Sequence, residues 1–154
     1  MIRVQEHPFD VGAELAALRT GNTVSGATAL FIGTVREGAG VGKISDMTLE
    51  HYPGMTEKAL ADIEQQARER WPLDETLIIH RYGRMEPGED IVMVIVLSAH
   101  RAAAFEACEF LMDWLKTSAP FWKLETRGDE TTWVEAKQSD DAARKRWLKD
   151  ASGE

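Results

Sequence analysis

The sequence predicts an α+β fold, with strands and helices that alternate irregularly in a single domain covering residues 1–154. Segments rich in strand-forming residues, such as 27–35 and 91–97, alternate with segments whose apolar residues recur at helical spacing, such as 56–71. A length of 154 residues suits one domain with a buried core, and no linker-like stretch divides the chain. A mixed α/β architecture is therefore expected.

The N-terminal half is expected to contain two strands and a helix. The strands cover 27–35 and 47–52, and Pro53 closes the second. The helix covers 56–71 and ends before Pro72, because a proline cannot continue it. Its apolar residues at helical spacing are Leu60, Ile63 and Ala67.

The next elements are two strands, at 77–82 and 91–97, on either side of a turn-rich stretch, 83–90. The second strand is apolar at almost every position, which is typical of a central strand covered on both faces. A helix is expected from a cap at Ser98 to about Thr117. The residues expected on its buried face are Phe105, Cys108, Met112 and Leu115.

A corner broken by a proline leads into the last elements. Pro120 prevents the long helix from continuing. Strands at 121–126 and 131–136 are expected to form a hairpin around 128–129. A short final helix opens at 139–141, where acidic residues suit the helix dipole.

Composition limits the possible function classes. The net charge of −8 argues against general binding to nucleic acid or to anionic membranes. The longest apolar run, 91–97, is too short to span a bilayer. The N-terminus has no apolar signal core, so a cytoplasmic location is expected.

The segment 116–125 holds the first candidate site. Lys116 and Lys123 flank Pro120 among aromatic residues, and lysines held by apolar neighbours can lose hydration and become usable as nucleophile or general base. Each lysine alone is more often a surface residue, and Lys116 at a helix C-terminus suits the dipole without any function. Alternation places Lys123 and Trp122 on opposite faces of their strand.

Two other groups of residues are candidate anion sites. His100 and Arg101 fall in the first turn of the long helix, where free N–H groups attract anions, although a solvated arginine and a packed histidine are the commoner explanation. Arg36 leads into the glycine-rich stretch 37–43, which suits either a ligand-binding loop or a plain hairpin loop. No Gly-Lys-Ser/Thr follows, so this stretch is not a phosphate-loop motif.

Helix length limits how these groups combine. His100 and Lys116 are 16 residues apart, which is roughly 24 Å along one unbroken helix. One small substrate cannot contact both ends. Either only one end is functional, or a symmetric dimer brings the helix start of one subunit against the lysines of the other.

The remaining candidate ligands are interpreted as structural. His51 and His80 lie in expected strands without a partner at metal-ligand spacing. The one cysteine, Cys108, excludes an intrachain disulfide and a CxxC metal site, and it is expected to be inert core. No metal site is expected.

Seven segments carry a family resemblance: FIGTVR (31–36), LEHYPGM (49–55), HRYG (80–83), SAHR (98–101), FEAC (105–108), the stretch 115–125 and WVEA (133–136). Together, in this order, they resemble the large, catalytic subunit of molybdopterin synthase, the MoaE family. The similarity covers nearly the whole chain. It implies an α/β hammerhead fold with an additional antiparallel β-sheet.

The resemblance implies a sulfurtransferase that converts cyclic pyranopterin monophosphate (precursor Z) into molybdopterin during molybdenum-cofactor biosynthesis. Two sulfur atoms would be installed as a dithiolene. Each would come from the thiocarboxylated C-terminal Gly-Gly of a small ubiquitin-like, MoaD-like carrier subunit. The family forms a homodimer at the centre of a heterotetramer. No cofactor is expected, because the carrier supplies sulfur and molybdenum arrives in a later step.

The resemblance also assigns site residues. Lys116 and Lys123 match the family's essential lysines, the first meeting the carrier tail and the second acting as acid/base or orienting the pterin. Arg36 matches an arginine that would bind the cyclic phosphate of the substrate or nearby oxygens. His100 and Arg101 match residues that the opposite subunit gives to the pocket.

Three further residues complete the expected pocket. Phe31 and Met112 would line it. Lys137 stands after WVEA, where the family often has arginine, so a bidentate phosphate contact becomes a point charge. The loop 37–43 is short and lacks the asparagines usual in the family, so none of its residues is assigned as a ligand.

Two other function classes are considered. A non-catalytic dimeric scaffold could bind a ubiquitin-like partner, but the presence of both lysines favours the enzyme. A phosphate-ester hydrolase would need a carboxylate–histidine or metal constellation, which the sequence does not offer.

Overall fold

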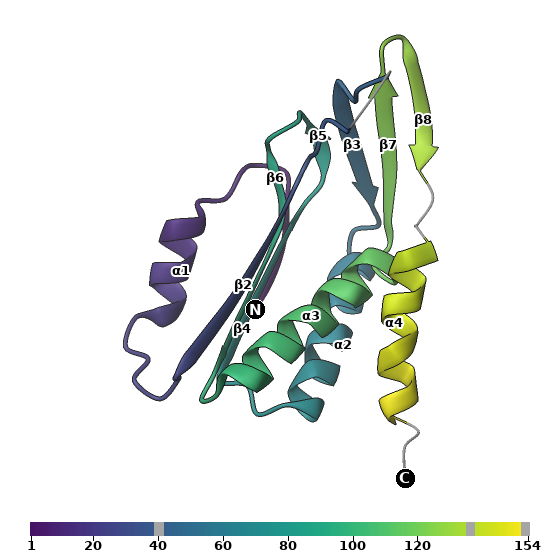
Figure 1. Cartoon of the computed structure of the whole chain (residues 1–154). Helices are drawn as coiled ribbons and strands as arrows, with labels where there is room; N and C mark the ends of the chain where they lie inside the picture. The colour runs from purple at the N-terminus through teal and green to yellow at the C-terminus, as the bar shows by residue number, and fades with distance from the viewer. Residues whose placement is uncertain (39–41, 135–137, 152–154) are drawn as a thin grey trace.

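The computed structural model describes residues 1–38, 42–134 and 138–151, and Figure 1 shows the path of the chain. The strands are β1 (Ile2–Gln5), β2 (Ala27–Thr34), β3 (Asp46–His51), β4 (Glu75–Arg81), β5 (Gly83–Met85), β6 (Asp90–Ser98), β7 (Phe121–Arg127) and β8 (Glu130–Val134). The helices are α1 (Val11–Arg19), α2 (Met55–Arg70), α3 (Arg101–Thr117) and α4 (Gln138–Ala151). The predicted α+β class is confirmed.

The first sheet has the strand order β1-β4-β6-β2. β1 runs parallel to β4, and the other neighbours are antiparallel. β6 lies between β4 and β2, and its residues 92–98 are all buried. The prediction that the apolar run 91–97 forms a central strand is therefore confirmed.

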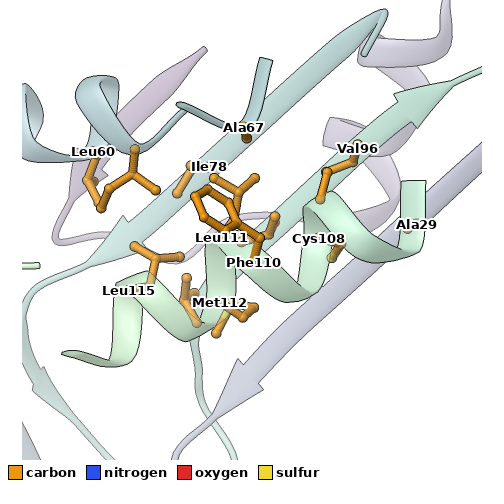
Figure 2. Packing of buried hydrophobic residues seen from close by; sticks show 14 of the residues in the cluster. Ala29, Leu60, Ala67, Ile78, Val96, Cys108, Phe110, Leu111, Met112 and Leu115 are labelled. Carbon is orange, nitrogen blue, oxygen red and sulfur yellow. The ribbon is translucent and has the colours of Figure 1, made fainter. Parts of the chain in front are cut away.

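Helices cover both faces of this sheet, with α2 and α3 on one face and α1 on the other (Figure 1). Neighbouring residues of β4 point to opposite faces, so Ile78 packs under α2 and α3, whereas Leu77 and Ile79 pack under α1. Figure 2 shows the larger of the two cores, where Leu60 and Phe110 are fully buried. Each such side chain contributes roughly 1.5–3 kcal/mol to folding.

The second sheet has the order β5-β3-β7-β8 and is antiparallel throughout. It stands beyond one end of the first sheet (Figure 1). A small core joins the two sheets, and its buried members are Val35, Met47, Leu49 and Met85, with Ile91 of β6 packed against them. This arrangement leaves room for a site between the sheets.

The start of α3 and three unpredicted elements differ from the sequence expectations. Ser98 does not cap α3: it ends β6, is fully buried, and donates from its hydroxyl to the carbonyl of Pro72 at 2.7 Å. His100 is the N-cap instead, without a side-chain cap hydrogen bond. The turn-rich stretch 83–90 contains a strand, β5, and the first 19 residues contain β1 and α1, which were not predicted.

The buried face of α3 also differs at one position. Phe105 was expected to be buried, but 67% of its surface is exposed. Cys108, Met112 and Leu115 are buried as predicted. The helix is unbroken over 17 residues, so the separation expected between its two ends holds.

Candidate active site

A cavity of about 290 Å³ lies between the two sheets, beside the C-terminal end of α3. Its walls come from strands of both sheets and from α3; most of the lining residues are apolar, Met112 among them, but polar and apolar atoms share the lining surface about equally. Within the described residues, the titratable side chains that line it are His80, Lys116 and Lys123. The two lysines singled out in the sequence therefore share one cavity.

β7 places Lys123 in this cavity. The helix stops before Pro120, and the strand that follows alternates its side chains, so Phe121 and Lys123 line the cavity. Lys123 lies between Leu49 of β3 and Val134 of β8, which also line it. Trp122 borders a separate hollow on the other side of the sheet, so the predicted opposite placement is confirmed.

α3 supplies Lys116 from its last turn. Lys116 lies one helical turn after Met112, and both line the cavity. The carbonyl groups at the end of a helix carry partial negative charge, which favours an ammonium group at this position. Lys116 is exposed, so a ligand that enters the cavity can reach it.

Lys123 has an acidic neighbour on its own strand. Its Nζ lies 3.4 Å from Oε1 of Glu125, whose side chain is only 9% exposed. The other oxygen of Glu125 lies 2.7 Å from Nη2 of Arg127. One nearly buried carboxylate is therefore shared by two cations, which fixes charge at the border of the cavity.

His80 is a cavity residue that sequence reasoning interpreted as structural. It lies on β4, is 7% exposed, and stacks on Phe121 with ring centroids 3.8 Å apart. Burial lowers the pKa of His80 to about 4, and the nearby Lys116 and His51 lower it as well. The histidine is therefore neutral at ordinary pH.

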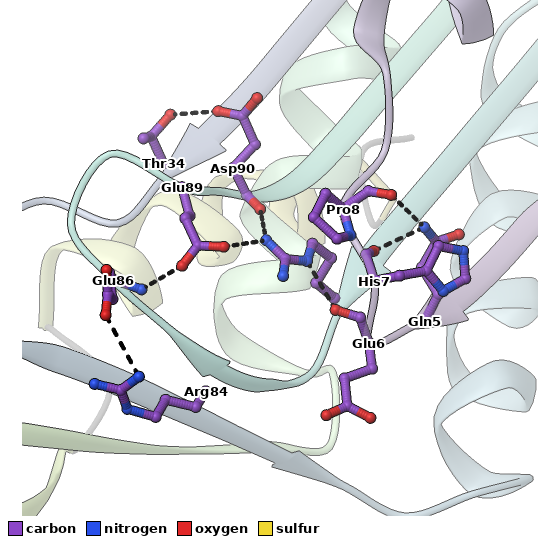
Figure 3. Close-up of polar contacts among 10 residues, drawn as sticks. Gln5, Glu6, His7, Pro8, Thr34, Arg84, Glu86, Glu89 and Asp90 are labelled. Carbon is purple, nitrogen blue, oxygen red and sulfur yellow. Dashed lines mark hydrogen bonds and ion pairs between the residues drawn. The ribbon is translucent and has the colours of Figure 1, made fainter.

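The residue after His80 anchors this end of β4. The buried Arg81 donates to the backbone carbonyl of Glu6 at 3.1 Å and to that of Asp90 at 3.0 Å, and it pairs with Glu89 at 3.3 Å. Figure 3 shows these partners around the start of β6 and the end of β1. The network ties three parts of the chain together beside the cavity.

Three basic residues expected in the pocket lie outside its lining. His100 and Arg101 are exposed at the opposite end of α3 from Lys116. Arg36 is exposed, two residues after Thr34, which does line the cavity. Within one subunit the structure therefore unites Lys116, Lys123 and Met112 but not these three residues.

Phe31 also lies outside the lining, next to the cavity wall. Gly33 forms that wall, and a Cβ placed on it would lie 2.7 Å from Cγ1 of Val92 and 3.4 Å from Cε1 of Phe31. Phe31 itself is 39% exposed on β2. The wall is therefore backbone, with Phe31 at its border.

Other expectations concern residues away from the cavity. Lys137 lies outside the described residues. Cys108 is buried, and burial raises the pKa of its thiol to about 11, which suits the inert core residue predicted. Across the described ranges, no three His, Cys, Asp or Glu side chains come together in a group that could hold a metal ion. No helix among the described residues is long and apolar enough to cross a membrane.

The signal for His80 was present in the sequence but was not decisive. His80 belongs to the HRYG segment, and a histidine in a strand gives no sign of which sheet it will face. Its position depends on the contact between β4 and β7, which belong to different sheets. Sequence patterns within one strand cannot predict a contact between two sheets.

Comparisons with known proteins agree on one family. Residues 4–118 match the family model described as MoaE protein. The molybdopterin synthase catalytic subunit of Ralstonia nicotianae is 55% identical over 146 residues, which cover 95% of this chain and 83% of that protein.

Solved structures give the same result. The molybdopterin biosynthesis MoaE protein from Burkholderia ambifaria is similar with a TM-score of 0.82 and 52% identity, covering 96% of this chain and 97% of that one. Molybdopterin synthase from Staphylococcus aureus is similar with a TM-score of 0.80 and 31% identity, covering 86% and 96% respectively.

Proposed function

This chain belongs to the MoaE family, and we propose that the cavity between its two sheets is the sulfur-transfer site of a molybdopterin synthase. Its relatives carry the name molybdopterin synthase catalytic subunit, and the chain is an enzyme of molybdenum-cofactor biosynthesis. The observation that carries the site assignment is the convergence of Lys116 and Lys123 on one cavity.

The proposed substrate is cyclic pyranopterin monophosphate, and the proposed sulfur donor is a thiocarboxylated carrier tail. In each transfer, the carrier's sulfur bonds to a substrate carbon, and a carbon–oxygen bond at that carbon breaks, so that the oxygen leaves as water or stays on the phosphate as its ring opens. Water then attacks the acyl carbon of the tail, and the bond between that carbon and the sulfur breaks. The sulfur stays on the substrate, and the carrier is released with an ordinary carboxylate. Two such transfers, from two carriers, complete the dithiolene.

The two lysines have separate proposed roles. Lys116, at the exposed end of α3, meets the acyl end of the tail and stabilises the negative charge that develops on its oxygen. Lys123, held by Glu125 at 3.4 Å, donates or accepts protons at the pterin or orients it. Fixed cations in a cavity that is partly shielded from solvent act more strongly than they would in open water.

The shape of the cavity suits a carrier tail. A Gly-Gly end has no side chains, so it can enter a narrow space as extended backbone. Gly33 keeps one wall at backbone level, because a side chain there would meet Val92. We place a small ubiquitin-like carrier outside this cavity, with its tail inside.

The pocket is completed, in this proposal, by a second copy of the chain. The outer edge of β2 has no partner strand within the described residues, and Leu30 and Phe31 on it are 40% and 39% exposed. Phe105 of α3 adds a third exposed apolar side chain, on a helix that packs against β2. A symmetric dimer would cover such a surface.

Antiparallel pairing of two β2 edges would have a consequence for the site. Ala27 of β2 lies opposite Ser98, so the start of α3 is near the beginning of β2. Thr34, at the other end of β2, lines the cavity. Because paired antiparallel strands run in opposite directions, His100 and Arg101 of one subunit would approach the cavity of the other. Four chains, two of this kind and two carriers, would form the complete enzyme.

The direct test is reconstitution. The purified protein is mixed with thiocarboxylated carrier and precursor, and the dithiolene product is measured. Lys116→Ala and Lys123→Ala should each lower product formation at least about 100-fold, because each removes a charge that acts in the transition state. Lys58→Ala is the matched control, because Lys58 is an exposed lysine that pairs with Asp62 at the surface, away from the cavity.

The same test separates the enzyme from a scaffold without chemistry, which the name of its relatives, molybdopterin synthase catalytic subunit, argues against. Such a scaffold would bind the carrier but form no dithiolene, with or without the lysines. If the unaltered protein forms product and Lys123→Ala forms it at the same rate, the role given to Lys123 is refuted. A cytoplasmic location stays a prediction.

A further inference from the structure

His80 differs from the two lysines of the cavity because it is almost fully buried. It lies on β4 opposite Val92 of the central strand, and 7% of its surface is exposed. Its ring stacks on Phe121 at an interplanar angle of 18°. A polar ring buried in this way needs hydrogen-bond partners, since an unpaired buried donor or acceptor is costly.

One ring nitrogen has a fixed role. Nδ1 of His80 lies 2.9 Å from the backbone carbonyl oxygen of Arg81. A carbonyl oxygen only accepts hydrogen bonds, so Nδ1 carries the proton. In the neutral ring, Nε2 then carries a lone pair and acts only as an acceptor.

Burial is the main reason why the ring of His80 stays neutral, because it lowers the pKa of the histidine, and nearby charges act in the same direction. Lys116 on α3 and His51 on β3 both act against a positive charge on it, in addition to its burial. Lys123 on β7 lines the same cavity. The strand that carries His80 continues into Arg81, whose guanidinium is bound to Glu6, Glu89 and Asp90.

The Nε2 acceptor of His80 and the ammonium donor of Lys116 can therefore satisfy each other. Lys116 carries three N–H donors and no acceptor. His80 offers one lone pair in the cavity that both residues line. We propose that His80 is a positioning residue: Nε2 of its neutral ring accepts a hydrogen bond from the Lys116 ammonium group and orients that group toward the carrier tail. The role of the carrier tail rests on the proposed function, but the contact between His80 and Lys116 does not.

The same ring positions Lys123 indirectly. Phe121 stacks on His80, and Lys123 follows two residues later on the same face of β7. His80 thus fixes one side of the cavity through stacking and the other through a hydrogen bond. Three variants separate these effects.

His80→Asn and His80→Gln form the matched pair. An asparagine amide can replace Nδ1 as the donor to the Arg81 carbonyl, but it leaves no acceptor where Nε2 lies. A glutamine amide reaches further and places a polar group near the position of Nε2. His80→Phe keeps the stack on Phe121 and replaces His80→Asn in the comparison if that variant does not fold.

The contact is tested without carrier or pterin. A limiting amount of acetic anhydride acylates exposed amines, and peptide mass spectrometry compares Lys116 with Lys58 in the same sample. Loss of the acceptor destabilises the ammonium form, so the ratio of Lys116 to Lys58 acylation should rise about threefold in His80→Asn. His80→Gln should return the ratio close to that of the unaltered protein. An unchanged ratio in His80→Asn, or in the folded His80→Phe, overturns the inference.

The catalytic consequence is tested separately in the reconstituted enzyme. His80→Asn should lower kcat roughly 10- to 100-fold, as expected for a misplaced reacting group, with KM for carrier and precursor changed less than about twofold. His80→Gln should recover part of kcat. Equal losses in both variants would assign His80 a merely structural role and overturn the inference. Absence of product with the unaltered protein would instead reject the proposed function, while the acylation ratio still decides the contact.

Discussion

Lys123 and Glu125 lie two residues apart on one face of β7, with Nζ and Oε1 separated by 3.4 Å. Arg127 occupies the next position on that face and reaches the other oxygen of Glu125 at 2.7 Å. The carboxylate is nearly buried, whereas the two cations are about 40% exposed. The strand thus carries an alternating row of charges that ends in the cavity.

Glu125→Gln should destabilise the protein and weaken catalysis. The change leaves Lys123 and Arg127 facing each other across a neutral amide. We expect the free energy of unfolding to fall by about 1–2 kcal/mol, a modest loss because solvent screens both cations. Urea unfolding measures it, and product formation should fall several-fold because Lys123 is less well held.

Glu75→Gln is the control for this change. Glu75 is exposed at the start of β4, and within the described residues it takes part in no ion pair. Its removal should change the free energy of unfolding by less than about 0.5 kcal/mol. Equal stability of the two variants would contradict the role of the charge row.

His80 should make stability depend on pH. Its pKa is about 4 in the folded protein against an ordinary 6.5, so between these values the unfolded chain binds a proton that the folded chain does not. The stability that depends on neutral His80 is complete above about pH 6.5 and is lost as pH falls toward about 4. Lowering pH from about 7 to about 5 should cost of the order of 2 kcal/mol through this group.

His80→Phe isolates this contribution. The variant cannot titrate at position 80, so its loss of unfolding free energy over the same pH range should be smaller by that amount. Carboxylates such as Glu64 and Glu89, whose pKa values are lowered in the fold, lose stability equally in both proteins. Urea unfolding at the two pH values gives the difference, and parallel losses would show that His80 is not buried in neutral form.

Gly33→Ala should damage both the fold and the cavity. The new methyl group would lie 2.7 Å from Cγ1 of Val92, a buried residue that has little freedom to move. Such overpacking costs roughly 1–3 kcal/mol. Urea unfolding measures the loss, and product formation should fall because the methyl group stands on the cavity wall.

Gly12→Ala is its matched control. Gly12 lies in α1, and a Cβ there would meet only Oδ1 of Asp10 at an ordinary 3.5 Å. Alanine favours a helix over glycine by about 0.5–1 kcal/mol, so this variant should be slightly more stable than the unaltered protein. A Gly33→Ala protein as stable as Gly12→Ala would show that β2 and β6 separate easily.

Elements with strong local signals could be predicted from the sequence. The continuous apolar run in β6 and the stop at Pro120 depend on nearby residues only. α1 and β5 could not be predicted, because α1 has no fully buried residue and β5 has three residues that owe their form to pairing with β3. Phe105 was misplaced because the buried face of α3 is centred one position away, on residues such as Ala104 and Leu111.

Part of the candidate site could likewise be predicted from the sequence. Lys116 and Lys123 stood out because lysines among aromatic residues are unusual, and the structure places both in one cavity. His80 did not stand out, because its role depends on a contact between two sheets. The placement of His100 and Arg101 in a pocket depends on a second subunit, so one chain leaves it a proposal.

Subunit mixing tests that placement. In the proposed dimer, a pocket takes its lysines from one subunit and Arg101 from the other, so Arg101→Ala and Lys116→Ala homodimers should both be inactive. After exchange, each mixed dimer would hold one intact pocket out of two. Random pairing makes about half of the dimers mixed, so product formation should return to about a quarter of the unaltered level.

The control mixes two variants that damage the same side of the pocket. Lys116→Ala with Lys123→Ala leaves every pocket of every dimer without one of its lysines, so mixing should restore nothing. Recovery in the first mixture alone would support a pocket shared across the β2 edge. No recovery, despite exchange shown by native mass spectrometry, would mean that Arg101 and Lys116 of one chain do not belong to pockets of opposite subunits. Since an unbroken α3 separates them by roughly 22 Å, Arg101 would then act outside the cavity.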